Sequence, residues 1–101
     1  MKKLWSKIKY MKHFGLPVLA TIEEIRHNEN VSLEGQHPYQ VICKYIDHSS
    51  LKIYYFSSEY IWYDPSTLLL DNVVRVYVNP SDYSDYFMDL NRILPKLTKK
   101  S

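Results

Sequence analysis

The feature that most constrains the fold is a series of short segments, rich in β-branched and aromatic residues, that recur from Pro17 to Leu90 with polar turns between them. Short runs with alternating apolar residues are typical of half-buried β-strands, and their regular spacing favours a small antiparallel barrel or sandwich. No long helical segments alternate with these strands, which argues against a parallel α/β sheet. The 101 residues are enough for one small domain.

The pattern predicts five or six strands. They are Val18–His27, Tyr39–Asp47, Leu51–Ser57, Tyr60–Tyr63, Val73–Val78 and Tyr86–Leu90. The first changes its apolar parity part-way, which predicts an irregularity near Glu23–Glu24. One face of the second is predicted to carry Tyr39, Val41, Cys43 and Tyr45. The predicted fold class is therefore mainly β: a small antiparallel β-barrel or bent sheet of five or six strands with a short N-terminal amphipathic helix.

Charge is distributed unevenly along the chain, although the formal net charge is only +2. Residues 1–14 contain five lysines and no acid, residues 15–95 contain five basic residues against all eleven acids, and the remaining residues add three lysines. A basic arm is attracted to the phosphates of lipids or nucleic acids, whereas an acidic body is repelled by them. We therefore divide the chain into a basic helix (1–15), a β-barrel-like domain (16–91) and a basic tail (92–101).

The basic segment is predicted to be an amphipathic helix, because its apolar residues recur at helical spacing with lysines mostly on the other face. Gly15 and Pro17 end it. Such a short helix is marginal alone in water, so three arrangements are open: it docks on the domain, lies on an anionic membrane, or is a disordered arm. The predicted membrane or partner contacts are Lys2, Lys3, Trp5, Lys7, Ile8, Lys9 and Lys12.

A dense aromatic region between residues 54 and 63 provides a second candidate surface. Tyrosine and tryptophan combine a large apolar body with a polar tip, so they suit binding surfaces as well as half-buried strands. Nucleic-acid stacking would need basic residues among these rings, and residues 53–71 contain no Lys or Arg. The predicted interaction face consists of Tyr54, Tyr60, Trp62 and Tyr63, with packing in the core or at its rim as the alternative.

The sequence predicts no catalytic, cofactor-binding or metal-binding residues. Cys43 lies in an apolar run, where a lone cysteine usually behaves as a small buried hydrophobe. His27, His37 and His48 lack the short spacing of zinc ligands. The repeat at 81–86 lacks the glycine and terminal glutamate of an EF-hand loop. The two glycines are too far apart for a phosphate-binding loop. We therefore expect a protein that is not an enzyme and needs no cofactor.

Three stretches together resemble a known family: GLPVLATIEEI near the start, YQVICKY…YYFSS…DP in the middle, and VVRVYVNPSDYSDYFMDL at the close. They resemble the bacterial β-domains grouped as family 3592 of domains of unknown function, over about residues 15–90. The residues that match the closing motif are Val74, Val76, Tyr77, Asn79, Pro80, Tyr86 and Asp89. Relatives commonly carry this domain beside transmembrane helices, and this chain departs from them because its sequence contains only the basic helix before Gly15. The resemblance implies no catalytic residues.

Taken together, these features predict a non-enzymatic accessory or interaction domain, peripheral to the bacterial membrane through its basic helix. Its expected location is the cytoplasm, at the inner face of the cell membrane. The alternative is a soluble protein–protein interaction module that uses the aromatic region, with self-association as one form of that interaction. The expected partners are an anionic membrane surface or a protein, including a second copy, and not a nucleic acid.

Overall fold

The computed structural model describes residues 9–65 and 72–90. Five predicted contact residues and the basic tail 92–101 lie outside the described residues. The five are Lys2, Lys3, Trp5, Lys7 and Ile8.

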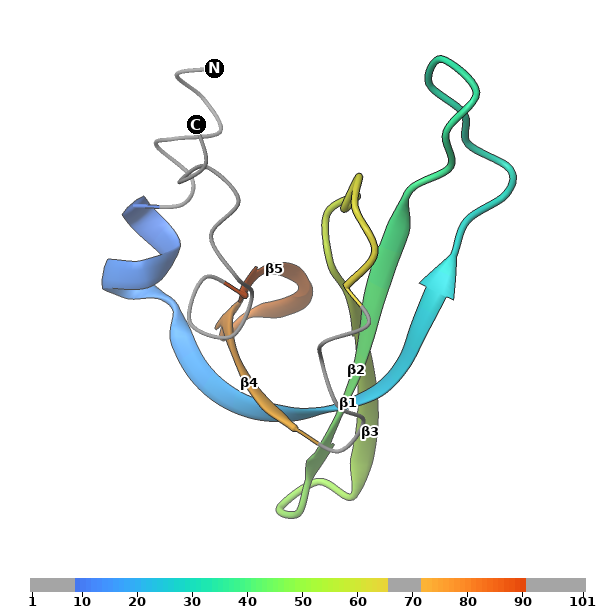
Figure 1. Ribbon diagram of the computed structural model, residues 1–101. Helices are drawn as coiled ribbons and strands as arrows, with labels where there is room; N and C mark the ends of the chain where they lie inside the picture. Colours follow the sequence, from blue (N-terminus) through green and yellow to red (C-terminus); the bar gives the residue numbers. More distant parts are fainter. Residues whose placement is uncertain (1–8, 66–71, 91–101) are drawn as a thin grey trace.

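The described residues form one antiparallel sheet, preceded by helical residues at 9–14. The strands are β1 (Leu16–His27), β2 (Tyr39–Asp47), β3 (Lys52–Ser57), β4 (Val73–Asn79) and β5 (Asp82–Asp89). Their spatial order is β3-β2-β1-β4-β5. The sheet is strongly curled into a half-barrel, and the β1–β2 hairpin projects from it as a long arm (Figure 1). The prediction of a mainly β fold with a bent antiparallel sheet and a short N-terminal helix is confirmed.

Strand β1 joins the two halves of the sheet, because its two ends have different neighbours. Its first half pairs with β4, from Leu16 to Thr21, and its second half pairs with β2, from Thr21 to His27. The register shifts between Ile22 and Glu24, which confirms the predicted irregularity. A bulge increases the local twist of a strand, and this one lies where β1 changes partner (Figure 1).

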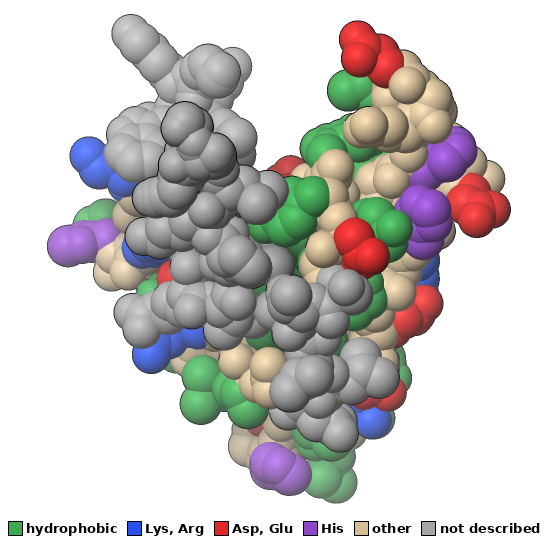
Figure 2. Space-filling model, viewed as in Figure 1, with side chains coloured by type: hydrophobic (Ala, Val, Ile, Leu, Met, Phe, Trp, Pro, Cys, Tyr) green, Lys and Arg blue, Asp and Glu red, His purple; other side chains and the backbone are tan. Residues whose placement is uncertain are grey.

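The core lies inside the curl and is built from the inward-facing residues of the strands. β4 contributes Val74, Val76 and Val78, as expected for a strand of alternating β-branched residues. The predicted face of β2 also points inward, since Val41 and Cys43 are fully buried and the tyrosines on either side pack against the core. Asp, Glu and His side chains lie along the β1–β2 arm on the opposite, exposed side (Figure 2).

The edges of the curled sheet meet through side chains. The Tyr86 hydroxyl on β5 accepts a hydrogen bond from the Ser57 amide on β3 (2.9 Å) and donates one to the Ser57 carbonyl (3.0 Å). The Tyr54 and Tyr83 rings are 4.7 Å apart, and the Phe56 and Tyr86 rings are 4.8 Å apart. We call this contact between β3 and β5 the tyrosine seam.

Several of the predicted strand bounds are wrong, and β1 already begins at Leu16. Tyr60–Tyr63 is not a strand and makes only a bridge between Ile61 and Tyr39, because the Ser58 hydroxyl, in place of a backbone carbonyl, accepts the Val41 amide at 2.9 Å. The last strand starts at Asp82 instead of Tyr86, since Pro80 and Ser81 make a tight turn closed by the Asn79 side chain. Leu51 lies in a turn with a φ of 61°, a conformation that excludes it from β3.

Candidate functional site

The end of the N-terminal helix is held on the sheet. Met11 is only 2% exposed, and the Gly15 amide donates to the Met11 carbonyl at 2.9 Å. The Lys12 ammonium lies 3.7 Å from the Asp89 carboxylate, whose side chain is only 4% exposed, and 5.9 Å from the centre of the Phe87 ring. Removing the partner of a buried charge is destabilising. The sequence left three arrangements of this helix open, and its described end adopts the first of them, docking on the domain.

On the outer side of this docked helix lies a group of exposed aromatic rings. Tyr10 and Phe14 are 59% and 64% exposed, and their ring centres are 5.0 Å apart. His13 packs edge-on against Phe14, and Lys9 beside them is exposed. Tyr10 and Phe14 are not among the predicted contact residues, because they fall outside the apolar stripe that contains Met11. Their position among lysines was the sequence signal that could have identified them as contact residues. We call Lys9, Tyr10, His13 and Phe14 the helix patch.

The structure divides the predicted aromatic face into two parts. Tyr54 and Tyr63 are half-buried and pack against the core, with Tyr54 in the tyrosine seam. Tyr60 and Trp62 are 46% and 40% exposed and meet edge to face at 6.1 Å. Only this second pair presents aromatic surface to a partner.

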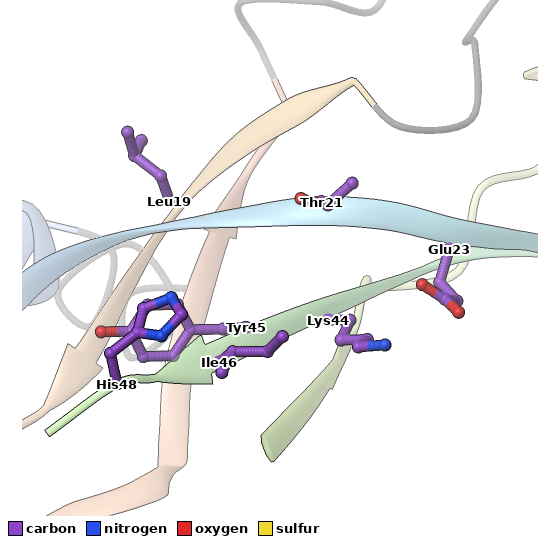
Figure 3. A pocket seen from close by; sticks show the side chains of 7 residues that line it. All are labelled: Leu19, Thr21, Glu23, Lys44, Tyr45, Ile46 and His48. Atoms are coloured by element: carbon purple, nitrogen blue, oxygen red, sulfur yellow. The ribbon is translucent and has the colours of Figure 1, made fainter. Parts of the chain in front are cut away.

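A pocket of about 490 Å³ opens between β1 and β2 on the side of the sheet away from the arm. Figure 3 shows its walls: Leu19, Thr21 and Glu23 on β1; Lys44, Tyr45 and Ile46 on β2; and His48 just after β2. Leu19 is one of the most exposed apolar residues of the sheet. Strand alternation indicates that Leu19 and Ile46 lie on the outer face, but the parting of the two strands depends on their register, which no local pattern encodes.

The described residues form no recognisable catalytic or metal centre. Within residues 9–65 and 72–90, no three His, Cys, Asp or Glu side chains lie close enough together to hold a metal ion. Two of the candidate histidines approach each other, with the rings of His27 and His37 5.9 Å apart. The His37 Nδ1 lies 2.8 Å from the Val31 carbonyl, and the His27 ring stacks on Tyr39 at 4.4 Å. These contacts lie where β1 and β2 meet their connecting loop, while His48 lines the pocket.

We expect the Cys43 thiol to be unreactive in the folded protein. The residue is fully buried, and burial raises the pKa of its thiol to about 12. Since the thiolate is the nucleophile, about one thiol in ten thousand would be ionised at pH 8. An aromatic disulfide reagent should modify Cys43 only at the rate of unfolding, and the rate should rise steeply in urea. Rapid modification in native buffer would contradict this placement.

The comparisons with known proteins add no relative to this geometry. No family model, no curated protein and no solved structure matches the chain. The resemblance to family 3592 therefore stays a prediction. The residues of its closing motif nevertheless have clear structural roles here, because Tyr86 joins the tyrosine seam and Asp89 meets Lys12. None of the helical segments within the described residues has the length and hydrophobicity that a bilayer crossing requires.

Proposed function

We propose that this protein is a non-enzymatic accessory domain that binds anionic lipid surfaces through its N-terminal helix. The observation that carries the proposal is the helix patch, in which two exposed aromatic rings lie beside a lysine on a helix whose other side is docked. Aromatic side chains favour the interface between water and lipid, and basic residues are attracted to anionic headgroups. The bilayer that fits this chemistry is the cytoplasmic leaflet of a bacterial membrane, where anionic lipids meet a cytoplasmic protein.

The docking of the helix supports this proposal. An isolated short helix would lose its order in water, but Met11 and the Lys12–Asp89 pair attach the helix to the sheet. The aromatic rings of the helix patch are thereby presented in a fixed orientation. Because Lys12 is paired with Asp89, it contributes less to lipid attraction than Lys9, and the lysines before it in the sequence supply the rest of the charge.

The test is co-sedimentation of the full chain with vesicles of phosphatidylglycerol and phosphatidylcholine, compared with phosphatidylcholine alone. We expect binding to the anionic vesicles only. Lys9→Glu should weaken it by about 2 kcal/mol, since each basic residue near the surface contributes about 1 kcal/mol and the reversal adds a repulsion. Phe14→Ala should weaken it further by removing an apolar anchor.

Two control variants, both on β3 of the sheet, repeat the charge reversal and the loss of an exposed ring away from the helix. Lys52→Glu reverses an exposed lysine on β3, and Tyr55→Ala removes a ring that is 59% exposed. Both should bind anionic vesicles like the wild type. Equal binding to neutral vesicles, or equal losses in the controls and the helix variants, would rule out the helix patch as the lipid-binding surface.

A second candidate function is protein–protein interaction through Tyr60 and Trp62. This edge-to-face pair is exposed on either side of Ile61, which makes the bridge to Tyr39, and exposed tyrosine and tryptophan are enriched at interface hot spots. The pair is small, so we regard it as secondary to the helix patch.

A further inference from the structure

Strands β1 and β2 separate before either of them ends. Their ladder stops at Thr21 and Lys44. Beyond this point β1 extends back to Leu16, and β2 continues to Asp47. The two strands diverge on either side of the pocket, as Figure 3 shows. We call this opening the β1–β2 wedge.

The backbone of β1 points into the wedge at alternate residues. The Ile22 amide donates to Asn72 on the β4 side, and successive residues of a strand direct their backbone groups to opposite edges. Ala20 and Val18 therefore face β4, and Leu19 and Pro17 face the wedge. Pro17 fits this assignment, because proline has no N–H and is tolerated where no ladder bond is required.

The backbone of β2 points into the wedge from the other wall. The amide and the carbonyl of Tyr39 both bond to Ile61, and the Val41 carbonyl accepts from Ser58, all on the β3 side. By the same alternation Ile46 faces β1, like Lys44 before it. Because the ladder has ended, the inward backbone groups of Leu19 and Ile46 have no ladder partner among the described residues.

The side chains of the wedge indicate what kind of occupant would fit. The walls combine apolar residues, Leu19 and Ile46, with one acidic and one basic side chain, Glu23 and Lys44. This balance of charge does not suit a phosphate or a polyanion, which would need a basic site. Backbone donors and acceptors on two strand edges instead match an extended polypeptide, which can satisfy them by adding a strand.

We propose that the β1–β2 wedge binds an extended segment of a partner protein by strand addition. The segment runs alongside Leu19 or Ile46 and completes the interrupted ladder with its own backbone. Its alternate residues are apolar and cover the exposed Leu19 and Ile46 side chains, while its charges are balanced to match Glu23 and Lys44. This binding site is separate from the helix patch and does not depend on lipid binding.

Hydrogen exchange of the free chain provides the first test. The amides of Leu19 and Ile46 should exchange faster than those of Ala20 and Tyr45, which face the neighbouring strands. Strong protection of Leu19 and Ile46 that grows with protein concentration would identify a second copy as the occupant and overturn the proposal. Protection that does not depend on concentration would place a segment of the same chain there and would also overturn it.

The second test selects ligands without assuming their sequence. A library of random linear peptides displayed on phage is selected against the full chain, and the enriched peptides are synthesised for titration by NMR. We expect sequences with alternating apolar residues that slow exchange at Leu19 and Ile46. Failure to enrich any peptide, or enriched peptides that protect Tyr60 and Trp62 instead, would overturn the proposal.

Two variants place the contact in the wedge. Leu19→Pro removes the inward N–H while preserving the bonds to β4, and Pro17 already occupies an equivalent position on this strand. It should weaken peptide binding about tenfold, the loss expected for a hydrogen bond and its neighbouring contacts. Ile46→Lys should weaken binding at least as much by placing a charge on the apolar wall.

The matched control is Leu33→Lys, which changes another exposed apolar residue, at the tip of the arm. Its peptide affinity should equal that of the wild type. Unchanged affinity in Leu19→Pro and Ile46→Lys would show that the peptides bind elsewhere. Vesicle binding should be the same in all three variants, which separates this site from the helix patch.

Discussion

Replacing Phe56 by alanine should lower the free energy of unfolding by about 3–5 kcal/mol, the range typical of a buried phenylalanine. Phe56 is only 1% exposed and lies inward on β3, paired with Cys43 of β2. Its ring meets the Tyr86 ring edge to face at 4.8 Å, so the substitution leaves a cavity in the core and removes the support of the tyrosine seam. The half-barrel has no backbone ladder between β3 and β5 with which to compensate.

The measurement is equilibrium unfolding in urea, with Tyr55→Ala as the control. Tyr55 is adjacent in the chain but lies on the outer face of β3, where it is 59% exposed. Its removal should cost less than about 1 kcal/mol, as is usual for surface substitutions. Similar losses for the two variants would mean that β3 does not have this register, since a slip of one residue exchanges its two faces.

The tyrosine seam explains why the closure of the half-barrel could not be predicted from the sequence. Alternation predicts which residues of a strand share a face, and Val41 and Cys43 do share one face of β2, which the structure buries. Alternation carries no information on which edges meet across the barrel. The Tyr86 hydroxyl takes the place of a neighbouring strand by bonding to both backbone groups of Ser57, and nothing in the local pattern around Tyr86 distinguishes it from the other tyrosines.

Turn chemistry explains why the start of the last strand was predicted wrongly. The segment 81–86 contains serine and aspartate, which are ordinary turn residues, and the sequence therefore predicted a long connection before the last strand. In the structure only Asp82 and Tyr86 of this segment are register partners of β4, opposite Asn79 and Val78, and the register shifts between these two pairs. The Asp82 carboxylate accepts hydrogen bonds from Ser84, so the turn-forming side chains bond locally within an irregular start of the strand, and the regular ladder with β4 begins at Tyr86.

The candidate sites were predictable to different degrees. The charge distribution located the basic helix, and the described end of that helix carries the exposed rings of the helix patch. The aromatic content of residues 54–63 predicted one surface, but packing against the core removed Tyr54 and Tyr63 from it. The β1–β2 wedge had no sequence signal, because it arises from two strand pairings that end at the same residue of β1, Thr21.

Substituting Gly15 by alanine should detach the helix from the sheet and destabilise the fold by about 1–3 kcal/mol, the usual cost of forcing extra atoms into a packed region. A Cβ at this position would lie 2.5 Å from the Met11 carbonyl oxygen and 3.2 Å from the Tyr77 Cβ. The first of these is a backbone atom, so the clash is relieved only if the last turn of the helix moves. Met11 would then leave its buried site.

A double-mutant cycle measures this coupling. In the wild type Met11→Ala should cost about 2–5 kcal/mol, as for other buried methionines. In the Gly15→Ala background the same change should cost much less, because Met11 is already displaced. The helix patch should also lose its fixed orientation, so Gly15→Ala should weaken binding to anionic vesicles although every lysine and aromatic ring is retained. Additive costs of the two substitutions, with vesicle binding unchanged, would show that the docking of the helix does not depend on Gly15.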